Sequence, residues 1–130
     1  MTNINFKNKT VVITGGSKGI GLEITKTFLK HQANVIILAR NKPKQKIQSK
    51  GNTGYFIECD IRNAESIDSA IKDIASKYKS IDVLINNAGG APMADSLTAS
   101  PKFHEAIIDL NLTAPLNLSQ KIAKKMIKQK

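Results

Sequence analysis

Features of secreted, membrane and metal-binding proteins are scarce in this sequence of 130 residues. Its single cysteine, Cys59, can form no internal disulfide, and His31 and His104 belong to no cluster of metal ligands. No run of about 18 apolar residues could cross a bilayer, and the polar opening lacks the apolar stretch of a secretory signal. We therefore expect one cytoplasmic domain over residues 1–130, with no metal site and no membrane partner.

Acidic residues are also few, at 10 against 20 lysines and arginines, which gives a formal net charge of +10. A basic balance can indicate nucleic-acid binding. Half of the basic residues lie in two stretches without acids, 40–50 and 121–130, but neither stretch contains an aromatic residue. No nucleic-acid-binding motif accompanies them. We therefore expect no nucleic-acid partner, and a basic nucleic-acid-binding protein is the least favoured alternative.

Four short runs of β-branched and apolar residues predict strands. Each is apolar on both faces, as in a parallel sheet that helices cover on both sides. The runs are TVVIT (10–14), NVIILA (34–39), GYFIEC (54–59) and IDVLIN (81–86). The stretch 40–53, with Pro43, Gly51 and several lysines, predicts at most a short helix and otherwise a loop.

In the segments between these runs, apolar residues recur with the periodicity of a helix. Between the first two, Ile20, Ile24 and Phe28 recur on one face. A second helix follows Asn63, a typical N-cap residue. Its apolar face consists of Ile67, Ile71, Ile74 and Tyr78. Ser100 and Pro101 are typical of the cap and the first residue of a long last helix.

The alternation of strands and helices predicts the topology. Strands joined by crossover helices run parallel, with right-handed connections. This predicts an α/β fold with a Rossmann-like, doubly wound parallel sheet in the strand order 3-2-1-4. Such sheets usually continue, whereas this sequence stops after the helix that would lead to a fifth strand. We therefore expect a fold that is truncated before its fifth strand.

The glycine-rich segment TGGSKGIG (14–21) links the first predicted strand to the first helix. Gly15, Gly19 and Gly21 permit a tight turn and a close approach of the backbone. Free N–H groups and the positive end of the helix dipole then face one point, where an anion binds favourably. The pyrophosphate of a dinucleotide has a suitable size. The alternative is a tight turn with close helix packing and no ligand.

The motifs of the chain, taken in their order along the sequence, resemble those of the short-chain dehydrogenase/reductase family. After TGGSKGIG come CDI (59–61), NNAG (86–89) and a lone Asn111 within LNL. The resemblance covers essentially the whole chain, but only the front half of a typical family member. It implies hydride transfer between a nicotinamide cofactor and a carbonyl or alcohol substrate.

The resemblance also implies roles for individual residues. Those expected beside the pyrophosphate are Gly15, Ser17, Gly19, Ile20 and Gly21. Those expected beside the adenine are Asp60, whose carboxylate would accept from the amino group, and Ile61. Those expected beside the ribose and nicotinamide are Asn87, Ala88 and Gly89. Asn86 would tie neighbouring strands together, and Asn111 would be the catalytic asparagine.

The end of the second run indicates which nicotinamide cofactor would bind. An acidic residue there would hold the 2′-hydroxyl of NAD, but the run ends in Leu38, Ala39 and Arg40. The planar guanidinium of Arg40 suits a phosphate, and Lys18 can approach the same point from the glycine turn. We therefore expect NADP (NADPH) to be preferred over NAD. The alternative is that both cations are merely solvated.

The other catalytic residues of the family have no counterpart here. The family uses a serine and a Tyr-x-x-x-Lys pair, but neither Tyr55 nor Tyr78 has a lysine four residues later. Pro115 has no N–H, so it would kink the last helix and free the carbonyl of Asn111 to hold a water. We expect a fragment of an NADP-dependent oxidoreductase that is inactive alone. A non-catalytic NADP-binding module is the alternative.

The last helix is more apolar than one sheet face requires. Its apolar residues are Ile107, Ile108, Leu112, Leu116, Ile122, Ala123, Met126 and Ile127. Relatives commonly pair this helix with its counterpart in another subunit, which would make the protein a homo-oligomer. The alternative is that the absent half of the fold would cover it.

Overall fold

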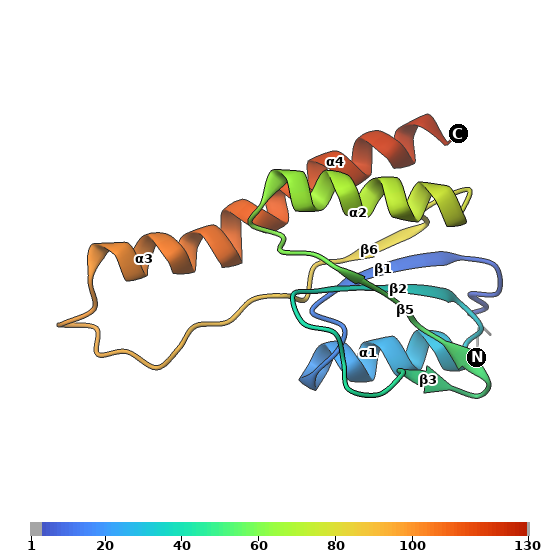
Figure 1. Ribbon diagram of the computed structural model, residues 1–130, viewed down its shortest axis with the longest axis horizontal. Helices are drawn as coiled ribbons and strands as arrows, with labels where there is room; N and C mark the ends of the chain where they lie inside the picture. The colour runs from blue at the N-terminus through green and yellow to red at the C-terminus, as the bar shows by residue number, and fades with distance from the viewer. Residues whose placement is uncertain (1–3, 130) are drawn as a thin grey trace.

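The computed structural model describes residues 4–129, and its centre is a sheet of four parallel strands (Figure 1). The strands are β1 (Thr10–Thr14), β2 (Asn34–Ala39), β5 (Tyr55–Glu58) and β6 (Val83–Ile85). They lie in the order β5-β2-β1-β6 and every pair is parallel. The predicted α/β class and the strand order 3-2-1-4 are confirmed. β5 and β6 are shorter than the apolar runs that predicted them.

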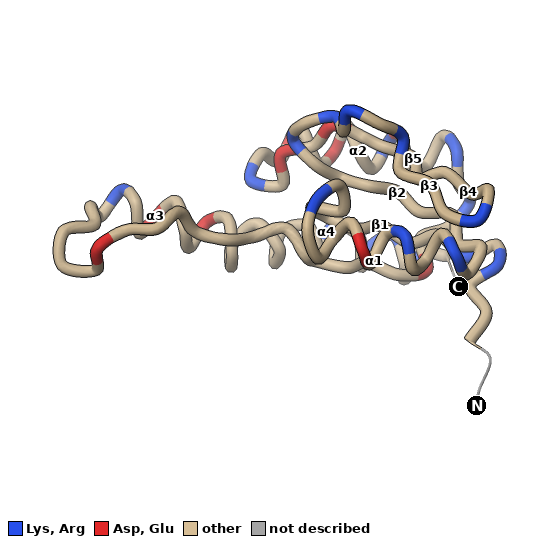
Figure 2. Tube along the Cα trace, turned by 90° about the horizontal axis from the view of Figure 1, so that it is seen from below, with Lys and Arg blue, Asp and Glu red and all other residues tan. Residues whose placement is uncertain are grey.

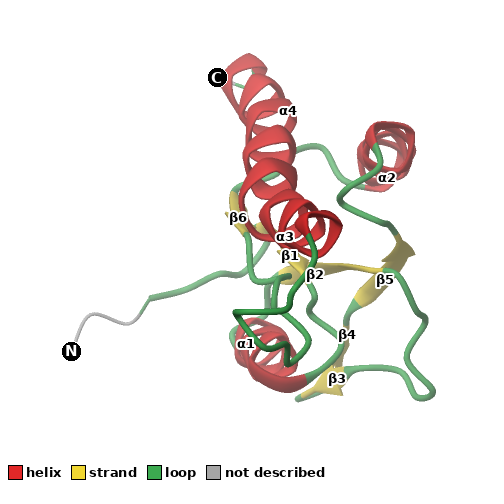
Figure 3. Ribbon diagram, turned by 90° about the vertical axis from the view of Figure 1, so that its left-hand side faces the viewer, coloured by secondary structure: helices red, strands yellow, loops and turns green. Residues whose placement is uncertain are grey.

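Helices cover both faces of the sheet (Figure 3). The helices are α1 (Gly19–Lys30), α2 (Ala64–Lys77) and α4 (Ala114–Lys128). Successive strand residues face opposite sides of a sheet. Val12 and Leu38 therefore join the core under α2 and α4, whereas Val11 and Ile37 join the core against α1. This arrangement explains why the central strands are apolar on both faces.

The buried face of α1 differs from the prediction. Its buried residues are Gly21, Thr25 and Leu29, whereas Ile20 is 78% exposed. The expectation that Ile20 shares the apolar face with Ile24 and Phe28 is therefore wrong. Small residues at the centre of the contact let the helix approach the sheet closely, and the larger Ile24 and Phe28 pack at its margin.

The helix predicted after Asn63 is present. The Asn63 side chain accepts a hydrogen bond from the Ser66 N–H at 2.8 Å, as expected of an N-cap. Ile67 and Ile74 are buried in the core, and Ile71 and Tyr78 pack against it.

The stretch after β2 contains a hairpin that the sequence analysis did not predict. β3 (Gln48–Ser49) pairs antiparallel with β4 (Asn52–Thr53). Lys50 and Gly51 form the turn with positive φ angles of 46° and 81°, as in the two-residue hairpins that join strands most tightly. Asn52 donates to the carbonyl of Leu29 at 3.0 Å, so the hairpin is fastened to the end of α1.

The long last helix is interrupted by a π-helical turn. Ser100 caps α3 (Pro101–Ile108) by accepting from the Phe103 N–H at 3.1 Å, as predicted. The turn η1 (Asp109–Thr113) then leads into α4, where Pro115 lies in the first turn. A wider turn thus precedes Pro115, at the place where the sequence predicted an interruption of the helix. Together with the preceding loop, α3 extends away from the sheet (Figure 1).

Among residues 4–129, no helix combines the length and the apolar character needed to cross a membrane.

Candidate functional site

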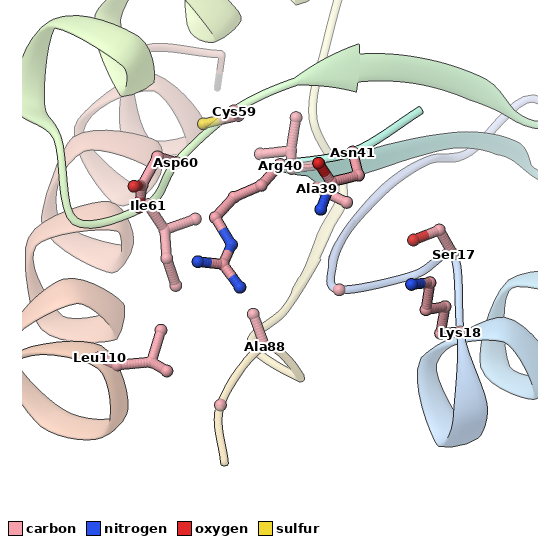
Figure 4. A pocket seen from close by; sticks show the side chains of 13 residues that line it. Ser17, Lys18, Ala39, Arg40, Asn41, Cys59, Asp60, Ile61, Ala88 and Leu110 are labelled. Atoms are coloured by element: carbon pink, nitrogen blue, oxygen red, sulfur yellow. The ribbon is translucent and has the colours of Figure 1, made fainter. Parts of the chain in front are cut away.

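A cavity of about 280 Å³ lies where the strands of the sheet end (Figure 4). Its lining residues are Gly15, Ser17, Lys18, Leu38, Ala39, Arg40, Asn41, Cys59, Asp60, Ile61, Ala88, Gly89 and Leu110. The carboxyl ends of parallel strands meet at one edge of the sheet, which is where open α/β sheets bind ligands. Segments far apart in the sequence therefore converge on one pocket.

Most of the predicted site residues line this pocket. They are Gly15, Ser17, Lys18, Arg40, Asp60, Ile61, Ala88 and Gly89. Four others, Gly19, Ile20, Gly21 and Asn87, do not line the cavity, although Gly19 and Asn87 adjoin lining residues in the chain. No binding role was predicted for Leu38, Ala39, Asn41, Cys59 or Leu110. Of these, Ala39 and Asn41 adjoin the predicted Arg40, and Cys59 adjoins the predicted Asp60.

Three glycines of the turn have different surroundings, so each has its own structural reason to be glycine. Gly15 has a φ of +63°, and its N–H donates to the carbonyl of Leu38 at 2.8 Å, which holds the turn against β2. A methyl group at Gly21 would overlap the Gly15 carbonyl and the Asn87 amide. Gly19 has a φ of +52°, and a Cβ atom there would meet nothing within 4 Å. Close packing thus accounts for Gly21, whereas Gly19 borders open space.

The N-terminus of α1 is free of side-chain caps. Lys18 occupies the N-cap position without making a side-chain cap, and the first carbonyl bonded within the helix is that of Lys18, which accepts from the Leu22 N–H at 3.1 Å. The amides of the first turn therefore keep their hydrogen-bonding capacity. Together with the helix dipole, they form a favourable environment for an anion beside Ser17 and Lys18.

The ends of β1 and β6 are joined by a compact hydrogen-bond network. The buried Thr14 hydroxyl accepts from the N–H groups of Asn87 and Ala88 at 3.0 Å and 2.9 Å. The Asn87 side chain donates to the carbonyls of Thr14 and Gly15 at 3.1 Å and 3.3 Å. This network fixes Ala88 and Gly89 at the pocket. No role was predicted for Thr14, because its place at a strand end gives no local signal.

The neighbouring Asn86 does not tie strands together, contrary to the prediction. Its side chain donates to the Ser119 hydroxyl of α4 at 2.9 Å. Consecutive residues leaving a strand point in opposite directions, so Asn87 turns toward β1 and Asn86 toward the covering helix. The strand-joining role belongs to Asn87.

Asp60 is held by a residue that the sequence analysis did not single out. Its carboxylate accepts from Nε and Nη2 of Arg62 at 3.1 Å and 2.9 Å, and from the Arg62 N–H at 3.0 Å. The Arg62 hydrogen bond holds the pKa of Asp60 below its usual value, and the charges of Arg62 and Arg40 contribute less. Asp60 is therefore an ionised acceptor at the pocket wall.

Two cations border the same cavity. Figure 4 shows the Arg40 side chain extending from the end of β2 into the pocket, while Lys18 and Ser17 line the side of the glycine turn. Cys59 lies deep at the wall, and burial raises the pKa of its thiol. The pocket thus combines cationic groups, free amides and apolar walls.

Asn111 fastens the π-helical turn to the loop after β6. Its side-chain oxygen accepts from the Gly90 N–H at 2.8 Å, and its side-chain nitrogen donates to the carbonyls of Gly90 and Ile107 at 2.8 Å and 2.9 Å. The side chain does not line the cavity, although the adjacent Leu110 does. Asn111 therefore holds two segments in place at the rim of the site.

The two tyrosines lie away from the pocket. The Tyr55 hydroxyl donates to the Asp73 carboxylate at 3.3 Å, and Lys77 Nζ lies 3.8 Å from the centroid of its ring. Tyr78 follows α2 and packs against the core. Within residues 4–129, no group of three or more histidine, cysteine or acidic side chains could hold a metal ion.

Comparisons with known proteins agree with this geometry. A family model for short chain dehydrogenases matches residues 9–130. A fatty acyl-CoA reductase of Mycobacterium tuberculosis is 34% identical over 139 residues, which cover 99% of this chain and 46% of that protein. The structure of an aldohexose dehydrogenase of Thermoplasma acidophilum has a TM-score of 0.84 and 32% identity, over 95% of this chain and 46% of its own.

A further structural neighbour contains a cofactor. A short chain dehydrogenase of Leptospira borgpetersenii with bound NAD⁺ has a TM-score of 0.83 and 30% identity, over 92% of this chain and 46% of its own. The chain therefore spans about half the length of the relatives that it matches.

Proposed function

Because the chain belongs to the short-chain dehydrogenase family, we propose that its pocket binds NADP(H). The chain would supply the cofactor-binding part of a cytoplasmic oxidoreductase that acts on a carbonyl or alcohol substrate. The observation that supports this most directly is the convergence of the uncapped N-terminus of α1 with Lys18 and Arg40 at one cavity. Both a pyrophosphate and a ribose phosphate are anions that such groups bind.

The residues present suit a dinucleotide. Ser17 and the amides before and within the first turn of α1 would hold the pyrophosphate. Ile61 and Leu110 offer apolar contacts for a planar base, and Asp60 offers an acceptor for its amino group. Gly19, Ile20 and Gly21 would contribute through the backbone, since the side chain of Ile20 is exposed. When bound, the nicotinamide supplies or accepts the hydride.

Asn87, Ala88 and Gly89 would lie along the ribose and nicotinamide. The hydrogen bonds that Thr14 accepts from Asn87 and Ala88 keep this segment at a fixed distance from the glycine turn. Asn111 would act from the substrate side, because its side chain fixes Gly90 and its own turn is widened ahead of Pro115. In this proposal the chain's residues orient the cofactor, and the substrate binds beyond Gly89.

The proposed preference for NADP depends on charge at the end of β2. Asp60 is the one acidic side chain among the residues that line the pocket, and Arg62 already binds it. Arg40 and Lys18 are the cations that could bind the 2′-phosphate of NADP. An acidic residue that would favour the free 2′-hydroxyl of NAD is absent from the lining residues at the end of β2.

Titration of the purified chain with NADPH and NADH tests both parts of the proposal. NADPH should bind more tightly, and Arg40→Asp should weaken NADPH binding by about tenfold or more while leaving or improving NADH binding, because a charge-assisted bond to phosphate is lost and an acceptor is gained. Lys42→Asp is the matched control, since Lys42 is exposed nearby but does not line the pocket. Equal affinities for both cofactors would contradict the preference.

Nucleic-acid binding receives less support. Figure 2 shows lysines and arginines distributed over several helices and loops, and not gathered in one stripe along a groove. A non-catalytic NADP-binding module is the second candidate, since neither tyrosine lines the pocket. The proposed partners are accordingly the cofactor, a small carbonyl or alcohol substrate, and a second copy of the chain along the last helix.

A further inference from the structure

Thr25 is a buried polar residue that does not line the cavity. It lies in the second turn of α1, is 0% exposed, and donates from its hydroxyl to the carbonyl of Gly16 at 2.9 Å. Buried hydroxyl groups are normally hydrogen-bonded, because an unpaired one is costly. Here the acceptor is the backbone of the glycine turn itself.

Thr25 also fills the space beside Gly16. A Cβ atom at Gly16 would lie 2.7 Å from Thr25 Oγ1, and 3.2 Å and 3.3 Å from the Cγ2 atoms of Ile13 and Ile37. Gly16 is buried and is not among the glycines with a positive φ angle. The absence of a side chain at this position therefore makes room for the Thr25 hydroxyl and is not required by the backbone conformation.

The contact between Thr25 and Gly16 fixes the orientation of a peptide group. In a planar trans peptide, the carbonyl of one residue and the N–H of the next point in opposite directions. Thr25 holds the Gly16 carbonyl toward α1, so the Ser17 N–H points away from Thr25. Ser17 and Lys18 line the cavity (Figure 4).

We propose that Thr25 is a positioning residue that orients the glycine turn for anion binding by holding the Gly16 carbonyl. This inference rests on the proposed function, because the anion would be the pyrophosphate of the cofactor. Thr25 does not line the cavity, so it would act only through the peptide between Gly16 and Ser17.

NADPH affinity of three variants tests the positioning role. Thr25→Val removes the hydroxyl at nearly constant volume and should weaken NADPH binding by about tenfold, the effect of one lost hydrogen bond. Thr25→Ser keeps the hydroxyl and should retain the wild-type affinity. Thr27→Val is the matched control, because Thr27 is exposed on the same helix and its hydroxyl donates to the Glu23 carbonyl at 2.8 Å.

A second ligand separates positioning from general loss of structure. Adenosine has no phosphate, so Thr25→Val should leave its binding, followed by NMR at high concentration, unchanged. Equal weakening of both ligands, or wild-type NADPH affinity in Thr25→Val, would overturn the proposal. Should Thr25→Val not fold, Thr25→Ala against Thr25→Ser gives the same comparison.

A double-mutant cycle measures the contact without any ligand. Gly16→Ala should lower the melting temperature clearly in the wild type and much less in Thr25→Ala, because the added methyl then occupies the space left by the hydroxyl. Equal losses in both backgrounds would refute the contact. Failure of the wild type to bind NADPH would refute the proposed function instead, and the cycle would show separately whether Thr25 holds the turn.

Discussion

Among single residues, Asp60 shows how one close neighbour sets the state of a group at the pocket. Arg62 binds its carboxylate through two side-chain nitrogens and one backbone N–H. The pair is partly exposed, with side-chain exposures of 34% and 36%, so solvent weakens the attraction. Its main effect is therefore to keep Asp60 ionised and in a fixed orientation, and not to stabilise the fold strongly.

Removing the Arg62 side chain should raise the pKa of Asp60. The Arg62 hydrogen bond is the largest cause of the lowered pKa, and the charge of Arg40 is the smallest. Arg62→Gln should therefore raise the pKa of Asp60 more than Arg40→Gln does, as followed by NMR titration of the Asp60 carboxyl carbon. Equal shifts in the two variants would contradict the assignment.

The same pair predicts the sign of a pH effect on stability. The pKa of Asp60 is lower in the folded chain, so the contribution is fully present above the unfolded pKa and is lost as the pH falls through the folded pKa. Acid unfolding of Arg62→Gln should begin at a higher pH than that of the wild type. Circular dichroism during acid titration measures this difference.

Among the elements, the π-helical turn η1 and the loop after β6 depend on each other through Asn111. α3 has no buried residue, so packing contributes little to the position of this part of the chain. The two hydrogen bonds between the Asn111 side chain and Gly90 therefore carry much of the connection. This makes the rim of the pocket sensitive to a single side chain.

Asn111→Ala should release the loop at Gly90. The Gly90 N–H loses its acceptor, so its hydrogen exchange should become about tenfold faster, as expected for the loss of one hydrogen bond. Asn117→Ala is the control, since Asn117 is an exposed amide on α4. Unchanged exchange at Gly90, measured by NMR, would show that other contacts hold the loop.

At the scale of the whole molecule, the last helix presents apolar side chains to solvent. Ile108, Leu112 and Leu116 are 54%, 57% and 57% exposed and follow one another at intervals of four residues. The spacing places them on one face of the helical rod. An exposed apolar row of this kind is typical of an interaction surface.

We expect the chain to self-associate through this row. The wild type should sediment as a dimer at micromolar concentration, and Leu116→Lys should sediment as a folded monomer because a charge would be buried in the contact. Ile4→Lys is the control, as Ile4 is 67% exposed outside this helix. A wild type that is monomeric throughout would contradict the expectation.

We also expect the 130-residue chain to bind cofactor without turning it over. Tyr55 is bound to Asp73 and Tyr78 packs against the core, so neither can donate a proton at the pocket. Oxidation of NADPH in the presence of carbonyl compounds should not exceed the rate without protein, in a sample that binds NADPH in parallel. Turnover at an ordinary enzymatic rate would refute this expectation.

Local sequence signals were enough to predict the sheet and the place of the pocket. The four apolar runs, the caps at Asn63 and Ser100 and the break before Pro115 are local signals, and each corresponds to an element of the structure. The topology then followed from the crossover rules, and it placed the ends of the strands together. The hairpin 48–53 was not predicted, because strands of two residues are too short to show a periodic pattern.

The side chains that hold the site together could be identified only from the folded structure. The Thr14 hydroxyl accepts hydrogen bonds from Asn87 and Ala88, which follow it by 73 and 74 positions in the chain. Nothing near Thr14 in the sequence indicates this contact. The exposure of Ile20, the strand-joining role of Asn87 in place of Asn86 and the contact of Thr25 with Gly16 depend on the tertiary structure in the same way. A hydrogen bond requires a distance and a direction between two groups, and these exist only after the chain has brought its distant segments together.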